Sequence, residues 1–191
     1  MRATSVWLKA VIVMVLALAA GSALAQRCAD NVADSAPDSR YQMNADGTVL
    51  DLQTGLMWMR CAMGQTWDSQ QGACTGDAAT YVWQDALGAA QSLDQSGGFA
   101  GYTDWRVPNY RALTSIARYR CHNPAINSKA FPNTPGMEFW TATPVSANYG
   151  SGWAVSFTTG QVGYLGFNNT FAVRLVRAGA FQLTPPASTA P

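Results

Sequence analysis

The residues with the clearest chemical potential are basic side chains in the middle of the chain. No acidic residue occurs from Arg106 to Met137. Guanidinium groups bind sulfate and carboxylate through paired hydrogen bonds, and an ammonium group attracts them as a point charge. The stretch therefore predicts a cationic strip that binds a polyanion. The candidate ligand-binding cations are Arg111, Arg118, Arg120 and Lys129. The alternative is that they only offset the dipole at a helix C-terminus, which contributes about 0.3–1 kcal/mol.

Exposed aromatic side chains give a second binding hypothesis. The C–H face of a sugar ring is apolar and weakly positive, so it stacks on tyrosine and tryptophan. Tyr149 and Tyr164 are the candidates for exposure around the last predicted hairpin. Trp153 alternates with Val155 and Phe157, so it is predicted to be buried.

Few groups in the chain are suited to catalysis. The single histidine, His122, adjoins Cys121, and adjacent residues rarely face each other as a nucleophile and its base. No GxSxG, HExxH or P-loop motif occurs. We therefore predict no catalytic residue and no cofactor, and expect that the protein is not an enzyme.

A metal site is not predicted either. Calcium needs several oxygen ligands close together. Asn44 and Asp46 lie in "NADGT", which lacks a downstream glutamate and is interpreted as a hairpin turn. Asn168 and Asn169 could offer oxygen atoms, but no carboxylate follows them.

The first 25 residues have the pattern of a secretory signal peptide. Arg2 and Lys9 flank the start of an apolar run shorter than the ~20 residues that a bilayer needs, and "ALA" precedes Gln26. Cleavage after Ala25 would leave no membrane span and an exported protein, in the periplasm, outside the cell or on its surface. The mature chain would carry ten basic and eleven acidic residues, so no overall charge attracts nucleic acid or a membrane.

Four cysteines follow the predicted cleavage site, an even number that favours two disulfides in an oxidising compartment. Three connectivities are open. We favour Cys61–Cys74, which closes a polar loop, and Cys28–Cys121, which ties the N-terminal segment to the end of the central helix. Chain entropy gives about 3 and about 4–5 kcal/mol for loops of these sizes.

The second predicted helix carries the first of these cations. Pro108 and Asn109 mark its start, because proline disfavours a helical residue before it and asparagine caps a helix. The apolar stripe extends the prediction over residues 110–120, with Arg111 and Arg118 on the outer face.

The turn before this helix, "DWRVPN", is interpreted as a corner of the fold. Trp105 is expected to fill the core, and Arg106 to pair with Asp104 or Asp94. The residues with a predicted structural role are Trp83, Trp105, Arg106, Pro108, Asn109 and Trp153.

The remaining elements follow from periodicity and turn residues. Residues 46–60 predict a hairpin, and residues 79–96 a helix that ends at Gly97 and Gly98. Later strands are predicted at 138–143, in a hairpin over 152–167, and in a buried closing strand over 171–177. This order indicates an α+β fold with an antiparallel sheet.

Several motifs carry a family resemblance. In chain order they are "DLQTGLMWMRC", "YVWQDALGAA", "GYTDWRVPN", "PAIN", "FPNTP", "FWTAT", "WAVSFTTG" and "VRLVR". Together they resemble the Lcl C-terminal domain, an exported bacterial module named after a collagen-like adhesin. The resemblance implies a C-type-lectin-like fold, related to formylglycine-generating enzymes, with two helices packed on an antiparallel sheet with long loops. For the namesake it implies adhesion through sulfated glycans. This chain has no Gly-X-Y run, so the collagen stalk is absent.

Four regions and one function are thus predicted. The regions are a signal peptide (1–25), an N-terminal arm (26–45), the Lcl C-terminal-like domain (46–179) and a disordered tail (180–191). The expected function is an exported, non-enzymatic binding or adhesion module for a sulfated or acidic glycan, with homo-oligomerisation left open. The alternatives are a degenerate formylglycine-generating-type enzyme and a structural component of the cell envelope.

Overall fold

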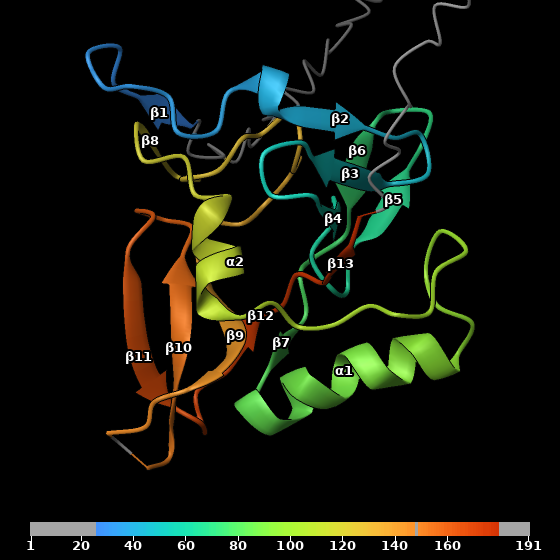
Figure 1. Cartoon of the computed structure of the whole chain (residues 1–191), viewed down its shortest axis with the longest axis vertical. Helices are drawn as coiled ribbons and strands as arrows, with labels where there is room; N and C mark the ends of the chain where they lie inside the picture. The colour runs from blue at the N-terminus through green and yellow to red at the C-terminus, as the bar shows by residue number, and fades with distance from the viewer. Residues whose placement is uncertain (1–25, 148, 180–191) are drawn as a thin grey trace, which may run out of the picture.

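The computed structural model describes residues 26–147 and 149–179 of the chain (Figure 1). The predicted signal peptide and tail lie outside these residues. The described part contains the helices α1 (Trp83–Gln95) and α2 (Tyr110–Ser115), a short 3-10 helix η1 (Asp38–Arg40), and strands in four sheets. The α+β class is confirmed. No helix in the described ranges is long and apolar enough to cross a bilayer.

A four-stranded antiparallel sheet forms the upper part of the molecule in Figure 1. Its order is β13 (Val176–Ala178), β4 (Leu56–Met59), β3 (Thr48–Asp51) and β2 (Tyr41–Met43). The predicted hairpin over 46–60 is β3 and β4. Residues 27–40, apart from Cys28, were expected to be irregular, which is wrong for η1. The reason is a buried ion pair between Arg40 and Asp51, which anchors this segment to the end of β3.

The second large sheet has five strands and lies lower in Figure 1. Its order is β11 (Val162–Gly166), β10 (Ser151–Ser156), β9 (Glu138–Pro144), β12 (Phe171–Ala172) and β7 (Thr80–Tyr81). Its pairs are antiparallel except β12 with β9, which is parallel and corrects the all-antiparallel expectation.

The predicted closing strand over 171–177 is in fact two strands in different sheets. β12 joins the five-stranded sheet and β13 the four-stranded one. The connecting residues Val173, Arg174 and Leu175 are fully buried, so the chain crosses from one sheet to the other through the core.

Two small ladders carry the disulfides. β1 (Arg27–Cys28) pairs with β8 (Cys121–His122), with Cys28 directly opposite Cys121. β5 (Thr66–Asp68) pairs with β6 (Ala73–Thr75), which contains Cys74. Both favoured disulfides, Cys28–Cys121 and Cys61–Cys74, are confirmed, and they account for every cysteine of the chain.

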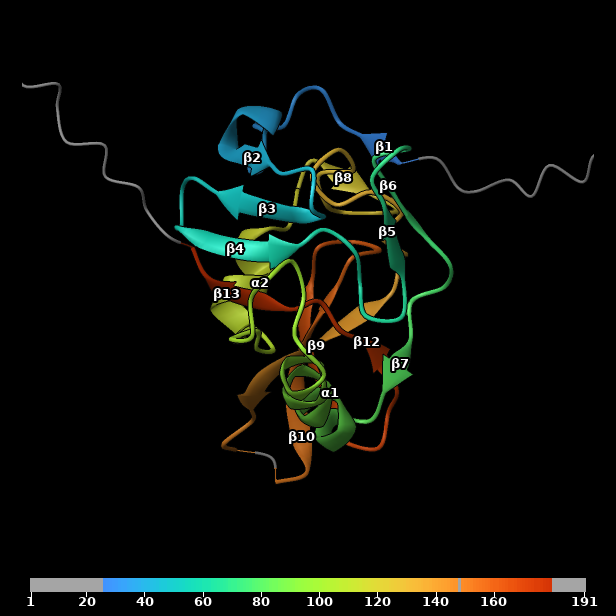
Figure 2. The ribbon, with the colours of Figure 1, turned by 90° about the vertical axis from the view of Figure 1, so that its right-hand side faces the viewer.

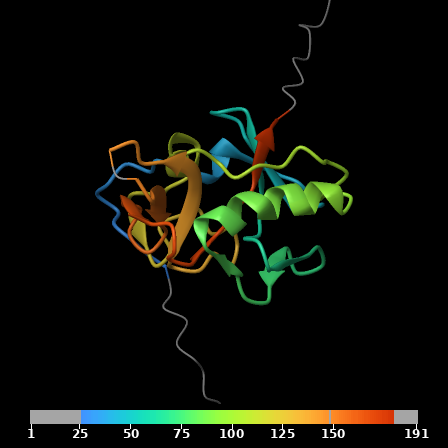
Figure 3. The ribbon, with the colours of Figure 1, turned by 90° about the horizontal axis from the view of Figure 1, so that it is seen from below.

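Helix α1 ends close to its prediction but begins later, at Trp83, because residues 80–81 of the predicted helix form the strand β7. It runs along the lower edge of the molecule in Figure 1, is seen nearly end-on in Figure 2 and lies crosswise in Figure 3. Ala86 and Ala90 are its buried residues, at a helical spacing. The helix ends before Gly97 and Gly98, which both have positive φ, and a Cβ at Gly98 would collide with the backbone of Tyr102.

Helix α2 is shorter than predicted and lies beside β10 in the middle of Figure 1. Asn109 caps it as expected, since its side chain accepts a hydrogen bond from the backbone N–H of Ala112 at 2.8 Å. The helix ends at Ser115 because the following backbone pairs elsewhere: Ala117 forms a bridge with Ile126, and the N–H of Arg118 donates to Ala125. Arg118 is therefore not on the helix.

Candidate functional site

The predicted cationic strip is largely neutralised by acidic residues of the N-terminal segment. Three of its four cations form ion pairs with carboxylates that lie more than eighty positions earlier in the chain. The pairs are Arg118 with Asp34, Arg120 with Asp30, and Lys129 with Asp38. The prediction of the strip rested on the lack of acidic residues nearby in the sequence, and these three residues do have acidic partners in the structure. This stretch of sequence without acidic residues therefore does not form a surface without acidic residues.

The ion pairs change the protonation of the carboxyl groups. The hydrogen bond from Arg118 lowers the pKa of Asp34, and the hydrogen bond from Lys129 lowers the pKa of Asp38. The Asp34 carboxylate in turn raises the pKa of Arg118. These carboxylates therefore stay charged below the usual pH range, and the pairs persist at neutral pH.

Arg111 is the exception in the predicted set. It forms no ion pair with any acidic residue in the described ranges, and it is exposed at the start of α2. Its Nε donates to the hydroxyl oxygen of Tyr110 at 3.1 Å, and the guanidinium lies 5.8 Å from the centre of that ring. The contact with Tyr110 holds one edge of the guanidinium and leaves the terminal nitrogens for a ligand.

Tyr110 is the first of three aromatic rings in a row. It stacks on Trp153 with ring centres 5.7 Å apart, and Trp153 meets Tyr164 edge to face at 5.8 Å. Trp153 and Tyr164 are direct partners across β10 and β11. Trp153 was predicted to be buried and is only half-buried. It packs against Tyr110 and Tyr164 and does not belong to either apolar core cluster.

A shallow groove of about 390 Å³ adjoins Arg111. Its lining includes Tyr110, Arg111, Tyr119 and Val162. Because Val162 lies two residues before Tyr164 on β11, the groove and the aromatic row share one face. We call this face the Arg111–tyrosine surface. It comprises Tyr110, Arg111, Tyr119, Trp153, Val162 and Tyr164.

The two tyrosines expected to be exposed are both exposed. Tyr164 is 55% exposed and belongs to the Arg111–tyrosine surface. Tyr149 is 97% exposed and lies in the loop between β9 and β10, where it makes no aromatic contact with a described residue. Sequence reasoning found Arg111 and Tyr164 but missed Tyr110 and Trp153 as their link. The sequence did show that Tyr110 adjoins Arg111, and it predicted the hairpin that carries Trp153 and Tyr164. It did not predict the register of that hairpin, which pairs these two residues.

The corner formed by "DWRVPN" has the structural role expected of Trp105. This side chain is 3% exposed, meets Phe99 edge to face, and donates from its indole nitrogen to the Phe99 carbonyl oxygen at 3.1 Å. Pro108 is buried, and its carbonyl oxygen accepts from the N–H of Ala142 at 2.8 Å. Trp83, also predicted as structural, stacks on Phe167 at 4.3 Å.

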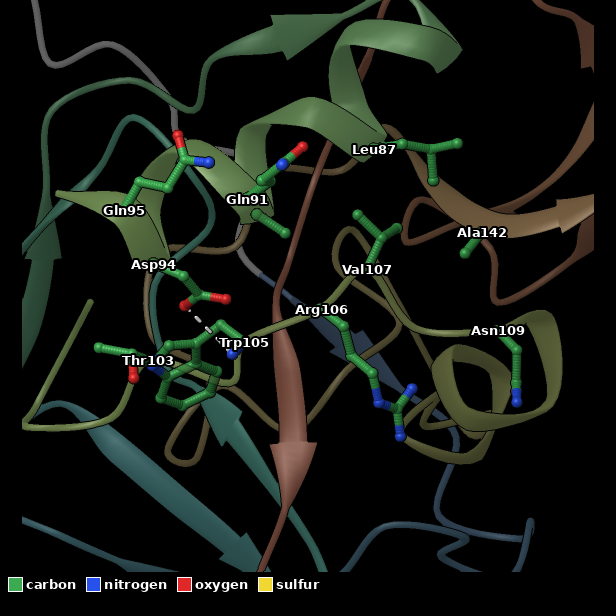
Figure 4. Close-up of a pocket in the computed structure, with 11 residues that line it drawn as sticks. Leu87, Gln91, Asp94, Gln95, Thr103, Trp105, Arg106, Val107, Asn109 and Ala142 are labelled. Atoms are coloured by element: carbon green, nitrogen blue, oxygen red, sulfur yellow. Dashed lines mark hydrogen bonds between the residues drawn. The ribbon is translucent and has the colours of Figure 1, made fainter. Parts of the chain in front are cut away.

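Arg106 does not pair as predicted. Asp104 binds Arg177, with 2.6 Å between Oδ1 and Nε, and Asp94 accepts from the backbone N–H of Trp105 at 3.2 Å. The backbone of Arg106 exchanges two hydrogen bonds with Val176, so its structural role is carried by the main chain. Its exposed side chain lines an open groove of about 740 Å³ between α1 and residues 103–109 (Figure 4).

The described residues form no evident centre for metal binding or thiol chemistry. In the ranges 26–147 and 149–179 no three histidine, cysteine or acidic side chains are grouped to hold a metal ion. Cys121 is bonded to Cys28, so it offers no thiolate to the adjacent, exposed His122.

Comparison with known proteins identifies the family. No curated protein was found to match the chain. The sequence profile of the Lcl C-terminal domain matches residues 47–177. These residues include the whole lining of the larger groove and all but Ser35 of the smaller one, but not the acidic residues Asp30, Asp34 and Asp38. The match covers well over half of the chain, and it confirms the resemblance carried by the motifs. The chain belongs to the Lcl C-terminal domain family.

Proposed function

We propose that the chain is an exported, adhesin-like binding module that holds a sulfated or acidic glycan on the Arg111–tyrosine surface. One observation carries the proposal: Arg111, which has no acidic partner among the described residues, adjoins a row of rings that ends in the exposed Tyr164. Sulfate and carboxylate pair with a guanidinium, and sugar faces stack on aromatic rings. Both kinds of contact are offered side by side.

Binding through this surface would be weak for a single domain. One unpaired guanidinium supplies the charge, and salt screens exposed charges over ~8–10 Å. The adjoining groove of about 390 Å³ is at the small end of ligand sites, so it suits one or two sugar units rather than a long chain. Firm adhesion would need several copies of the domain on one surface.

The proposal also holds that the protein is exported and that it is not an enzyme. Two disulfides favour an oxidising compartment, and they engage all the cysteines that a formylglycine-type reaction would require. We also propose the C-type-lectin-like assignment of the fold, supported by two helices beside twisted sheets, long connecting loops and two disulfides.

The experiment is retention of the mature chain, residues 26–191, on a sulfated-glycan column. Arg111→Gln and Tyr164→Ala should each elute earlier, and the double variant earlier still. Arg118→Gln is the matched control, because it removes an arginine that is already paired with Asp34. Unchanged retention of the Arg111→Gln, Tyr164→Ala double variant would contradict the proposal.

A structural envelope component remains the second candidate, and one observation favours it. β11 is an edge strand, with Val162, Tyr164 and Leu165 exposed along it. An exposed edge can accept a strand from another copy of the chain. Light scattering after size-exclusion chromatography tests this: assembly that grows with concentration supports the structural role, and a persistent monomer excludes it.

A further inference from the structure

The groove between α1 and residues 103–109, here called the corner groove, is distinct from the Arg111–tyrosine surface. It has a volume of about 740 Å³ and is open to solvent. Figure 4 shows its two walls: Leu87, Gln91 and Asp94 come from α1, and Arg106 and Asn109 from the segment that leads into α2. Its volume lies within the range of small-molecule sites.

One end of the corner groove carries hydrogen-bond donors. The Arg106 guanidinium makes no side-chain hydrogen bond or ion pair with any residue that the structure describes, while its backbone is fixed by Val176. The Oδ1 atom of Asn109 is engaged by the N–H of Ala112, so its amide nitrogen is left to donate. A guanidinium group and an amide N–H₂ group can together donate hydrogen bonds to a carboxylate.

The other end carries a negative charge. Asp94 is half-buried, and its Oδ1 accepts from the N–H of Trp105 at 3.2 Å. Its second oxygen has no partner among the described residues, and no ion pair joins it to Arg106. Figure 4 shows Asp94 and Thr103 on one side of the groove and Asn109 on the other. A carboxylate with a free oxygen attracts an ammonium group.

The lining between these ends is apolar. Leu87, Val107 and Ala142 contribute to it, with Val107 held almost fully buried in the core beneath. A few polar groups that converge over an apolar floor are typical of small-molecule sites. Such a floor would bind a hydrocarbon side chain.

We propose that the corner groove binds a small zwitterion of the peptide class: a short peptide with an apolar side chain, whose terminal ammonium and carboxylate groups are far enough apart to reach the two ends of the groove. Its carboxylate binds Arg106 and Asn109, its ammonium group binds Asp94, and its side chain lies against Leu87 and Val107. Charge complementarity selects this class, because an acidic sugar would satisfy Arg106 but bring no positive charge to Asp94.

Calorimetric titration of the mature chain tests the proposal with matched probes. L-leucylglycine represents the short peptide. In L-leucine one carbon atom carries both charged groups, so it cannot reach both ends of the groove. N-acetyl-L-leucylglycine lacks the ammonium group, and L-leucylglycinamide lacks the carboxylate. L-leucylglycine should bind, and L-leucine and the two single-charge probes should each bind about tenfold or more weakly, which corresponds to at least about 1.4 kcal/mol.

Two substitutions test which residue binds each charged group of the ligand. Arg106→Gln should weaken the binding of L-leucylglycine about tenfold but leave that of L-leucylglycinamide unchanged, because this probe has no carboxylate. Asp94→Asn keeps an oxygen for the N–H of Trp105, and should weaken the binding of L-leucylglycine while leaving that of N-acetyl-L-leucylglycine unchanged. Arg111→Gln, a variant of the Arg111–tyrosine surface, should leave zwitterion binding unaltered, so this proposal and the glycan proposal can fail separately.

Three results would overturn the zwitterion proposal. The first is no binding of L-leucylglycine up to about 10 mM, with the fold verified by thermal unfolding. The second is zwitterion binding that neither Arg106→Gln nor Asp94→Asn weakens. The third is tighter binding of D-glucuronate that depends on Arg106 and not on Asp94, which would make the groove an acidic-sugar site.

Discussion

Arg118 and Asp34 lie 84 positions apart in the chain and form a two-pronged ion pair, in which Nε of Arg118 is 2.9 Å from Oδ1 of Asp34. Both side chains are only 18% exposed. The pair joins the N-terminal segment to the turn after α2, next to the Cys28–Cys121 disulfide. It also pairs Arg118 with a carboxylate, so this contact bears both on the stability of the fold and on which arginine is proposed to bind the ligand.

The first prediction concerns this ion pair. Asp34→Asn and Arg118→Gln should each lower the free energy of unfolding by about 1–2 kcal/mol, since a charge-assisted hydrogen bond in a sheltered position is lost. Urea unfolding of the mature chain measures the change. In the double variant the losses should be smaller than additive, and strict additivity would mean that the two side chains do not interact.

The second prediction concerns acid. The folded chain holds the pKa values of Asp34, Asp38 and Asp104 below their ordinary value of 3.8, through hydrogen bonds from Arg118, Lys129 and Arg177 respectively. The unfolded chain therefore binds protons at a higher pH than the folded one. The stabilisation is fully present above about pH 4 and is lost as the pH falls through the lowered values. Melting temperatures between pH 6 and pH 2 test this, and Asp34→Asn should show a shallower decline.

The third prediction separates two neighbours in the corner. Trp105→Ala should cost about 3–5 kcal/mol, because a buried indole is replaced by a cavity. Arg106→Gln should change stability by less than about 0.5–1 kcal/mol, since the side chain is exposed and its backbone contacts remain. Denaturant unfolding compares them. A Trp105→Ala variant that melts like the parent would refute the core assignment.

The fourth prediction separates two arginines near the end of the chain. Arg174 is fully buried, its pKa is lowered by burial, and it donates to the carbonyl oxygens of Met59 and Arg60. Arg174→Met should cost about 2–4 kcal/mol, because these buried acceptors lose their donor. Arg177→Gln should cost less than about 1 kcal/mol, since its partner Asp104 is 56% exposed. Equal costs for the two variants would contradict this distinction.

The fifth prediction concerns salt. If Arg111 supplies the charge for glycan binding, retention of the mature chain on a sulfated column should fall steeply as sodium chloride is raised. Arg111→Gln should elute early at every salt concentration, with its melting temperature unchanged. Replacing Tyr164 with alanine should lower retention without changing the salt dependence, because stacking is not screened. A salt dependence that survives Arg111→Gln would place the binding charge elsewhere.

Features that depend on near neighbours could be predicted from the sequence. The cap at Asn109 rests on a contact with Ala112, three residues away, and α1 ends where two glycines follow it. The end of α2 could not be predicted, because Ala117 continues an apolar stripe at helical spacing. Its backbone instead pairs with Ile126, and no local signal marks that competition.

The sequence by itself determined the α+β class and the family, and it predicted two disulfides and the burial of Trp105, since motif order, cysteine number and apolar periodicity are properties of the chain. It left three disulfide connectivities open, and the structure shows Cys28–Cys121 and Cys61–Cys74. Only the tertiary structure decided which cations are free. Coulomb attraction acts over a few ångströms in space, so Asp34 neutralises Arg118 across 84 positions while Arg111 has no described carboxylate in ion-pair range. It also decided that Arg111, Tyr110 and Tyr164 share one face, because that placement depends on how α2 packs beside β10 and β11.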